Sequence, residues 1–162
     1  MDTSHDLEKS IWTDKDFETM GWHDNSIHAI GLLKESLDEP ELVLDIDYIT
    51  EWLDATPPSP YMEFYIAPST LVFHTVFDLK INMSWYYPDL RIDDITYINR
   101  EPPYQDSDVK AWLIQCDVGE IEFISSGFTQ YMRQQPRWHP HLHFKVSERG
   151  GLSFERKAYY SK

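Results

Sequence analysis

Residues 41–52 read ELVLDIDYITEW, and this stretch decides the predicted fold. Apolar side chains occupy its even positions, namely Leu42, Leu44, Ile46 and Tyr48. Asp45 and Asp47 occupy odd positions between them. Because successive side chains of a β-strand point to opposite faces, this alternation predicts a strand with one packed face and one face open to solvent.

Short segments of the same kind recur along the chain, and turn residues separate them. Further strands are expected at residues 26–34, 61–66, 70–85, 92–100, 109–117, 120–125, 128–133, 141–147 and 152–160. Pro68 predicts an interruption at Ala67-Pro-Ser, and the glycines at 150–151 predict a final hairpin. The long segment 70–85 is expected to be bent, or split near Asp78. The spacing predicts a mainly β fold, α+β at the margin, with an antiparallel sheet curled into a sandwich or a partly open barrel.

One short helix is predicted near the N-terminus, at residues 11–21. Thr13 suits the N-cap, and Gly21 suits the left-handed residue that ends a helix. We expect residues 1–10 to be flexible and residues 26–160 to form the β-rich body. A chain of 162 residues is long enough for one domain with a proper core and short for two, so residues 1–162 are predicted to form a single domain.

Cysteine content and hydropathy indicate the compartment. Cys116 is the only cysteine and lies inside an apolar run, which predicts a buried, unreactive thiol. The first residues are polar and acidic and lack the apolar core of a secretory signal. No apolar stretch approaches the roughly 20 residues that span a bilayer. Together these features predict a cytoplasmic protein.

The charge is strongly negative and unevenly distributed. The chain holds 28 Asp and Glu against 14 Lys and Arg, a formal net charge of -14, yet residues 133–162 hold seven of the bases and only two acids. Such an acidic body repels nucleic acid and anionic membranes, so neither is an expected partner, and it attracts basic proteins. We expect Asp45, Asp47 and Glu51 to contact a basic protein partner. The alternative is a homo-oligomer, in which the basic end of one copy lies on the acidic body of another.

Three histidines near the C-terminus form the densest cluster of reactive side chains. On a strand, His139, His141 and His143 could project from one face and bind zinc or another divalent transition metal. Pro140 disturbs regular strand geometry, however, and a wet polar face beside basic residues is the alternative interpretation.

His23 and Asp24 form a second candidate pair. Adjacent His and Asp side chains occur as metal ligands or as an oriented general base, and they would join the metal site if the fold brought them beside His141 and His143. Alternatively, Asp24 hydrogen-bonds free backbone donors and shapes the turn into the first strand.

Residues 22–27 read WHDNSI and lead from the predicted helix into a β-hairpin. The stretch resembles an aromatic-His-Asp-small-x-Ile/Leu element that begins an antiparallel sheet in small bacterial β-rich proteins. Several of these groups look like immunity proteins of bacterial toxin systems, and others have no assigned role. The resemblance implies a binding protein rather than an enzyme and carries over no catalytic residue.

The leading hypothesis is therefore a non-enzymatic acidic binding protein, an immunity-like inhibitor of a basic bacterial toxin, with no cofactor. Complementary charge would speed the association of such a pair. The alternative is a metal-binding protein or metal-dependent enzyme that uses the C-terminal histidine cluster. Tyr61, Tyr65 and residues 85–87 and 159–160 supply aromatic rings that could stack on sugars or anchor a protein partner.

Overall fold

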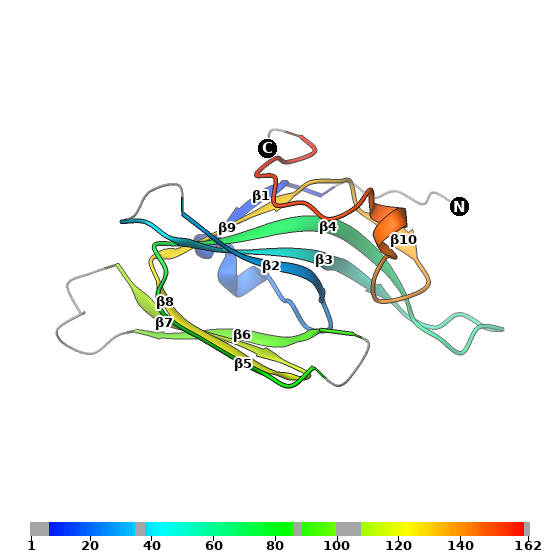
Figure 1. Cartoon of the computed structure of the whole chain (residues 1–162). Coiled ribbons are helices and arrows are strands. Elements are labelled where there is room, and N and C mark those ends of the chain that lie inside the picture. The colour runs from blue at the N-terminus through cyan, green and yellow to red at the C-terminus, as the bar shows by residue number, and fades with distance from the viewer. Residues whose placement is uncertain (1–6, 35–37, 86–88, 100–107, 161–162) are drawn as a thin grey trace.

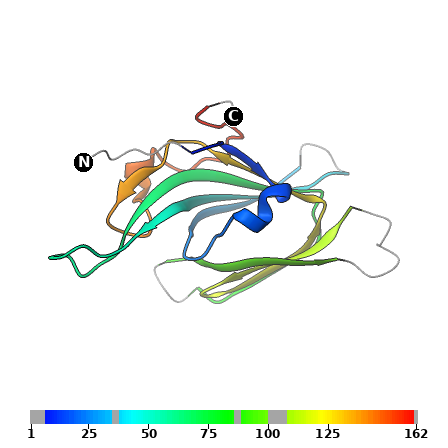
Figure 2. The ribbon, with the colours of Figure 1, turned by 180° about the vertical axis from the view of Figure 1, so that it is seen from behind.

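The computed structural model describes residues 7–34, 38–85, 89–99 and 108–160, which form two stacked antiparallel β-sheets (Figures 1 and 2). Sheet A contains, in spatial order, β1 (Ile11–Thr13), β9 (Gly127–Met132), β4 (Glu63–His74), β3 (Glu41–Leu53) and β2 (Ser26–Leu33), and β10 (Arg137–His139) also pairs with β4. Sheet B contains β5 (Phe77–Met83), β8 (Gly119–Ser125), β7 (Lys110–Cys116) and β6 (Ile92–Asn99). The mainly β prediction is confirmed, and the two sheets form a sandwich rather than a closed barrel.

The main core lies between the two sheets. Alternate, apolar residues of each strand point into it. Leu44 and Ile46 of β3 and Ile114 and Ile121 of sheet B are completely buried in it. Removing such side chains from water supplies most of the favourable free energy of folding. The packed face predicted for residues 41–52 is therefore confirmed.

Two neighbouring chain segments cross together from sheet A to sheet B, one between β4 and β5 and the other between β8 and β9. Ser126 donates its amide proton to the His74 carbonyl oxygen at this crossing (3.1 Å). Thr75 and Gly127 have φ angles of 51° and 146°, which sharpen the bends. The predicted split of segment 70–85 is confirmed. It lies between His74, where β4 ends, and Phe77, where β5 begins in the other sheet.

The interruption predicted at Ala67-Pro-Ser is wrong, because β4 runs through it. The Pro68 carbonyl oxygen accepts a hydrogen bond from the Arg133 amide (2.9 Å). The nitrogen and carbonyl of one strand residue point to the same side, so the missing N–H of Pro68 faces this side too. On this side β4 pairs with β9 up to Ser69 and with β10 from Ile66, and Pro68 lies in the gap between the two partners. The proline therefore removes no hydrogen bond from either strand pair.

The predicted helix is shorter and tighter than expected. It is the 3-10 helix η1 (Asp14–Thr19), and β1 occupies the residues before it. Thr13 caps it as predicted, and its own amide donates to the Asp16 carboxylate (2.9 Å) in a capping box. Gly21 does not end the helix, because Met20 is already extended. Among the described residues, no helix combines the length and apolar character needed to cross a membrane.

Residues 1–6 of the segment predicted to be flexible lie outside the described residues. The remainder of that segment is held by the other end of the chain: the Leu7 amide donates to the Tyr159 hydroxyl (3.1 Å), and Ser10 is completely buried. Residues 7–10 thus pack against the rest of the fold, and their flexibility stays a prediction. The two ends of the described chain stabilise each other along the β1 side of sheet A (Figure 1).

The C-terminal hairpin predicted for residues 141–160 is also wrong. The chain instead forms the 3-10 helix η3 (Val146–Arg149) and then runs in extended form across the outer face of sheet A (Figure 1). Gly150 and Gly151 have φ angles of 79° and 99° and end η3 instead of forming a hairpin turn. We call residues 144–156 the strap. Its Phe154 ring fits over Gly31 of β2, where a Cβ atom would lie 2.8 Å from the ring.

Candidate functional site

Asp45 and Asp47, the two β3 acids predicted to face solvent, are completely buried beneath the strap. The Arg149 guanidinium donates two parallel hydrogen bonds to Asp45 (2.7 Å each), and its Nε donates to Asp47 (3.0 Å). The prediction that this face is open to solvent is wrong, because the strap covers it. Neither carboxylate is available to a partner here, whereas Glu51, farther along β3, is exposed.

The remaining polar groups around these carboxylates are also paired. Arg149 directs its other two N–H groups to the carbonyl oxygens of Ile46 (3.2 Å) and Gly151 (3.0 Å). Further hydrogen bonds reach the two carboxylates from the side chains of Arg133 and His28 and the amides of Phe144 and Ser153. Burial alone would raise the pKa of Asp45, but these hydrogen bonds and positive charges lower it below its ordinary value. The cluster therefore fastens the strap to sheet A.

A second contact of the same kind lies at the start of β3. Glu41 accepts hydrogen bonds from the Arg156 guanidinium of the strap, and His74 lies 2.8 Å from the same carboxylate. Three acids of β3 thus face three arginines, namely Arg133, Arg149 and Arg156. Their formal charges cancel, so the rest of the chain carries the whole net charge of -14.

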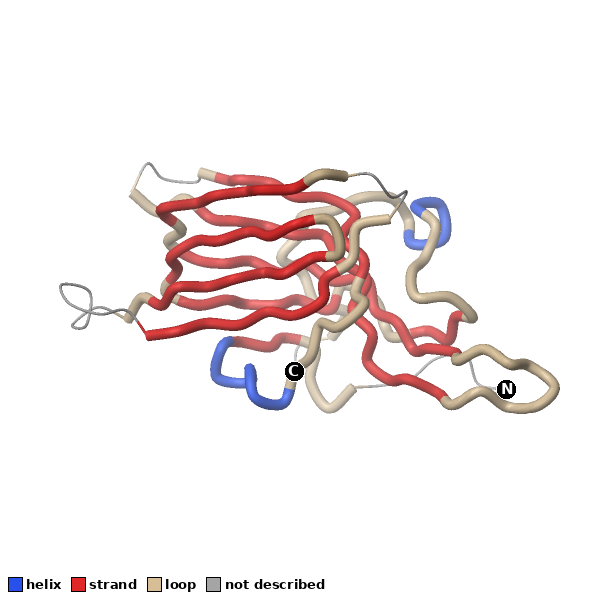
Figure 3. Tube along the Cα trace, turned by 90° about the horizontal axis from the view of Figure 1, so that it is seen from below, coloured by secondary structure: helices blue, strands red, loops and turns tan. Residues whose placement is uncertain are grey.

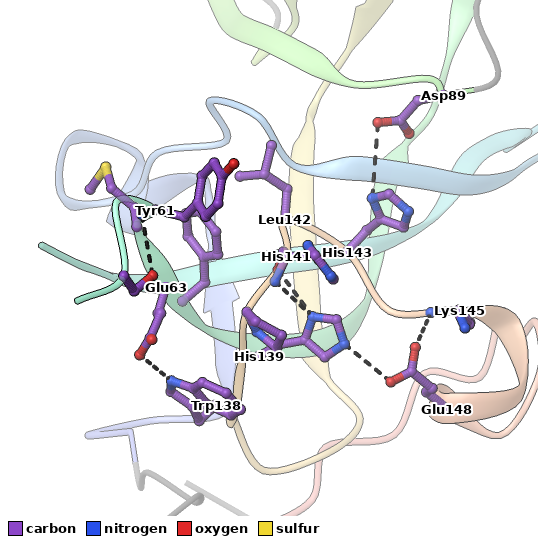
Figure 4. Close-up of a pocket in the computed structure, with 14 residues that line it drawn as sticks. Tyr61, Glu63, Asp89, Trp138, His139, His141, Leu142, His143, Lys145 and Glu148 are labelled. Carbon is purple, nitrogen blue, oxygen red and sulfur yellow. Dashed lines mark hydrogen bonds and ion pairs between the residues drawn. The ribbon is translucent and has the colours of Figure 1, made fainter. Parts of the chain in front are cut away.

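The three C-terminal histidines line a pocket of about 1020 Å³ at one end of the sandwich (Figure 4). The pocket lies between residues 59–64, which lead into β4, and residues 138–145, which include the end of β10. Asp89 and Glu148 complete the lining. Pairing of β10 with β4 brings these two segments together, since His139 lies opposite Phe64 in the register.

His139 is nearly buried and is held at both ring nitrogens. Its Nδ1 accepts a hydrogen bond from the His141 amide (3.1 Å), and its Nε2 donates to Glu148 (3.1 Å). The Lys145 amide and His139 together lower the pKa of Glu148. Both ring nitrogens of His139 are thus engaged, and these contacts fix the loop between β10 and η3.

The other predicted metal ligands are less constrained but do not join into one site. His141 is exposed, and Nδ1 of His143 lies 3.9 Å from an Asp89 oxygen. His23 stacks on Trp52, with the ring centroids 6.2 Å apart, and Asp24 is paired with Arg91. Neither His23 nor Asp24 lines the histidine pocket.

In the part of the chain that the structure describes, no three His, Cys, Asp or Glu side chains are grouped to hold a metal ion. Metal binding by these residues stays a prediction. Cys116 adds no reactive group, because burial and the neighbouring carboxylates of Asp117 and Asp93 raise its pKa to about 12. Its predicted burial is confirmed.

The walls of the pocket are aromatic and apolar. Trp138 donates its indole N–H to Glu63 (2.7 Å), which fixes both side chains at the rim. Tyr61, which the sequence marked as a candidate stacking residue, is 74% exposed beside them. The sequence pattern did not single out Glu63, because its position beside Trp138 depends on the pairing of β4 with β10.

The outer face of sheet B is the other accessible surface of interest (Figure 3). Cross-strand pairing arranges its outward side chains in three rows. The first row is apolar: Phe77, Ile124, Ala111 and Ile98. Phe77 and Ile98 are exposed in it, whereas Ile124 is buried. The second is mixed: Lys80, Glu122, Leu113 and Thr96. The third is polar and acidic: Asn82, Glu120, Gln115 and Asp94. A shallow groove of about 290 Å³ lies over the first two rows.

Comparison with protein-family models, with curated proteins and with solved structures found no match for this chain.

Proposed function

We propose that this protein is a non-enzymatic binding protein that engages a basic protein partner. The more specific form of the proposal is an immunity-like inhibitor of a basic bacterial toxin that acts in the cytoplasm. The resemblance of residues 22–27 to the element found in small bacterial β-rich proteins motivates this form. The charge distribution in the folded chain gives the proposal its physical support.

The observation that carries the proposal is the internal pairing of the C-terminal arginines. In the sequence, the basic end of the chain argues against a uniformly acidic inhibitor. In the fold, Arg149 is completely buried, and Arg133 and Arg156 also face acids of β3. Pairing removes three of the seven bases from the free charge of the basic end, although Lys145 and Lys157 stay exposed. The net charge of -14 keeps the long-range field of the whole chain negative. Such a field accelerates encounter with a cationic protein.

The outer face of sheet B is the docking surface that we propose. Ile98 is 70% exposed in the apolar row, and Glu122 and Asp94 are exposed in the other two rows. An apolar strip beside charged side chains has the character of a protein interface, where apolar contact supplies affinity and charge supplies rate and specificity. A second acidic copy of the chain would be repelled, which favours a basic partner.

Binding to the product of the reading frame immediately upstream of the gene tests this proposal. Titration calorimetry should show a complex whose affinity falls as the salt concentration rises from about 50 to about 300 mM, because salt screens the exposed charges. The double variant Glu120→Lys/Glu122→Lys should weaken binding by about tenfold or more, because it reverses charge within the docking surface.

The double variant Glu8→Lys/Glu18→Lys makes the same two charge reversals at exposed positions outside sheet B and serves as the matched control. It should change the affinity by less than about threefold, since it lies outside the docking surface. Equal losses for the control and for the sheet B variants would exclude sheet B as the docking surface. A complex that is insensitive to salt would contradict the electrostatic basis of the proposal.

A further inference from the structure

We propose that the histidine pocket binds the guanidinium group of an arginine side chain presented by a polypeptide. The pocket lies at the end of the sandwich where Trp138, Tyr61 and Glu63 come together (Figure 4). This inference concerns a second site and does not rest on docking of a partner to sheet B.

Aromatic rings supply the surfaces on which a guanidinium stacks. Trp138, Tyr61 and Phe64 all line the pocket, and Tyr61 is largely exposed. A planar cation placed over such a ring is attracted by its negative face. The same end of the fold already contains one such pair, since the Arg137 guanidinium carbon lies 4.5 Å from the centroid of the Phe144 ring.

Carboxylates at the pocket favour a cation over a neutral ligand. Glu63 and Glu148 line it together with Asp89, and among the described lining residues Lys145 is the one Lys or Arg. Trp138 bonds only Oε2 of Glu63, and within the described residues Oε1 of Glu63 accepts no hydrogen bond. A carboxylate oxygen of this kind beside aromatic rings matches the N–H donors of a guanidinium.

The apolar part of the lining suits the aliphatic stem of arginine. Met62 and Leu142 both line the pocket, and Met62 is 39% exposed. The volume of about 1020 Å³ exceeds that of one side chain, so it leaves room for flanking backbone. A polypeptide therefore fits the pocket better than free arginine.

Proton–nitrogen NMR with a titrated probe tests the site directly. N-acetyl-arginine amide should shift the indole N–H signal of Trp138, which is assigned by its loss in Trp138→Phe. N-acetyl-citrulline amide has nearly the same shape without the charge and should produce no shift at equal concentration. The pentapeptide Ala-Ala-Arg-Ala-Ala should bind at least about fivefold more tightly than the single residue, because its flanking backbone also contacts the pocket.

The matched variants are Glu63→Gln and Glu122→Gln, which remove the same charge at the pocket and on sheet B. Glu63→Gln keeps an acceptor for Trp138 and should weaken probe binding about tenfold, whereas Glu122→Gln should change it less than about twofold. Equal binding of the citrulline probe, or equal losses in the two variants, would overturn the guanidinium site. Equal affinity of peptide and single residue would overturn the polypeptide source alone. None of these outcomes depends on whether a basic protein docks on sheet B.

Discussion

The outer faces of the two sheets start from similar sequence patterns and end in opposite environments. β3 of sheet A and β8 of sheet B each alternate core residues with acids. On sheet A the strap buries Asp45 and Asp47 against Arg149, whereas on sheet B Glu122 stays exposed. Strand periodicity therefore reports which side chains share a face, but it does not report what covers that face.

Removing Arg149 should have the largest effect. Its guanidinium is the central cation on the outer face of sheet A, which the strap covers and which we call the covered face. Arg149→Met leaves two buried carboxylates without their main partner and should lower the free energy of unfolding by about 3–5 kcal/mol. Urea denaturation measures this loss. Lys157→Met removes an equal charge from an exposed position just beyond the strap and should cost less than about 0.5 kcal/mol. Similar losses for the two variants would show that the buried pair adds nothing beyond net charge.

Overfilling the contact between the strap and β2 should have the next largest effect. Gly31→Val places methyl groups where Phe154 now packs and should cost about 1–3 kcal/mol through overpacking. Phe154→Ala in the Gly31→Val background should recover part of the loss, because the smaller side chain makes room. No recovery in the double variant would exclude the ring as the source of the strain. Both variants are compared by thermal and urea unfolding.

Acid should loosen the covered face through the carboxylates that hold the strap. The pKa values of Asp45 and Glu41 are lowered in the fold: burial opposes this, and hydrogen bonds from Arg149 to Asp45 and from Arg156 to Glu41 prevail. A lowered folded pKa contributes stability that is fully present above the unfolded value, near 4, and is lost as the pH falls through the folded value. Unfolding free energies measured from about pH 6 to pH 3 should therefore fall, and the fall should be smaller in Arg149→Met.

The local features of this fold were predictable, and the features that define its surfaces were not. Thr13 as an N-cap and the β7–β8 hairpin follow from residues close together in the sequence. The Arg149–Asp45 contact joins residues 104 positions apart, and no periodicity links them. The histidine cluster was visible, but its pocket was not, because β10 pairs with β4 rather than extending into the predicted hairpin.

The pairing of the C-terminal arginines with β3 changes how the charge distribution of the chain is interpreted. Counted along the sequence, the last 30 residues look like a basic patch that could attract a second acidic copy. In the fold, three of their arginines face acids of the same chain, so the pairing imagined between copies forms within one copy. Charge asymmetry along a sequence therefore says little about charge asymmetry on a surface until the contacts are known.

The smallest effect is expected on the outer face of sheet B, which no strap covers in the described residues. Glu122→Gln on β8 removes one exposed charge from a residue whose register partner is Lys80. It should change the free energy of unfolding by less than about 0.5 kcal/mol, because charges on an exposed surface interact weakly through water. The matched change on the covered face, Asp45→Asn, should cost several-fold more, since it leaves the charge of Arg149 buried and poorly paired. Urea denaturation of both variants at neutral pH measures the difference between their free energies of unfolding. If Glu122→Gln costs as much as Asp45→Asn, the outer face of sheet B contributes to folding rather than remaining available for a partner.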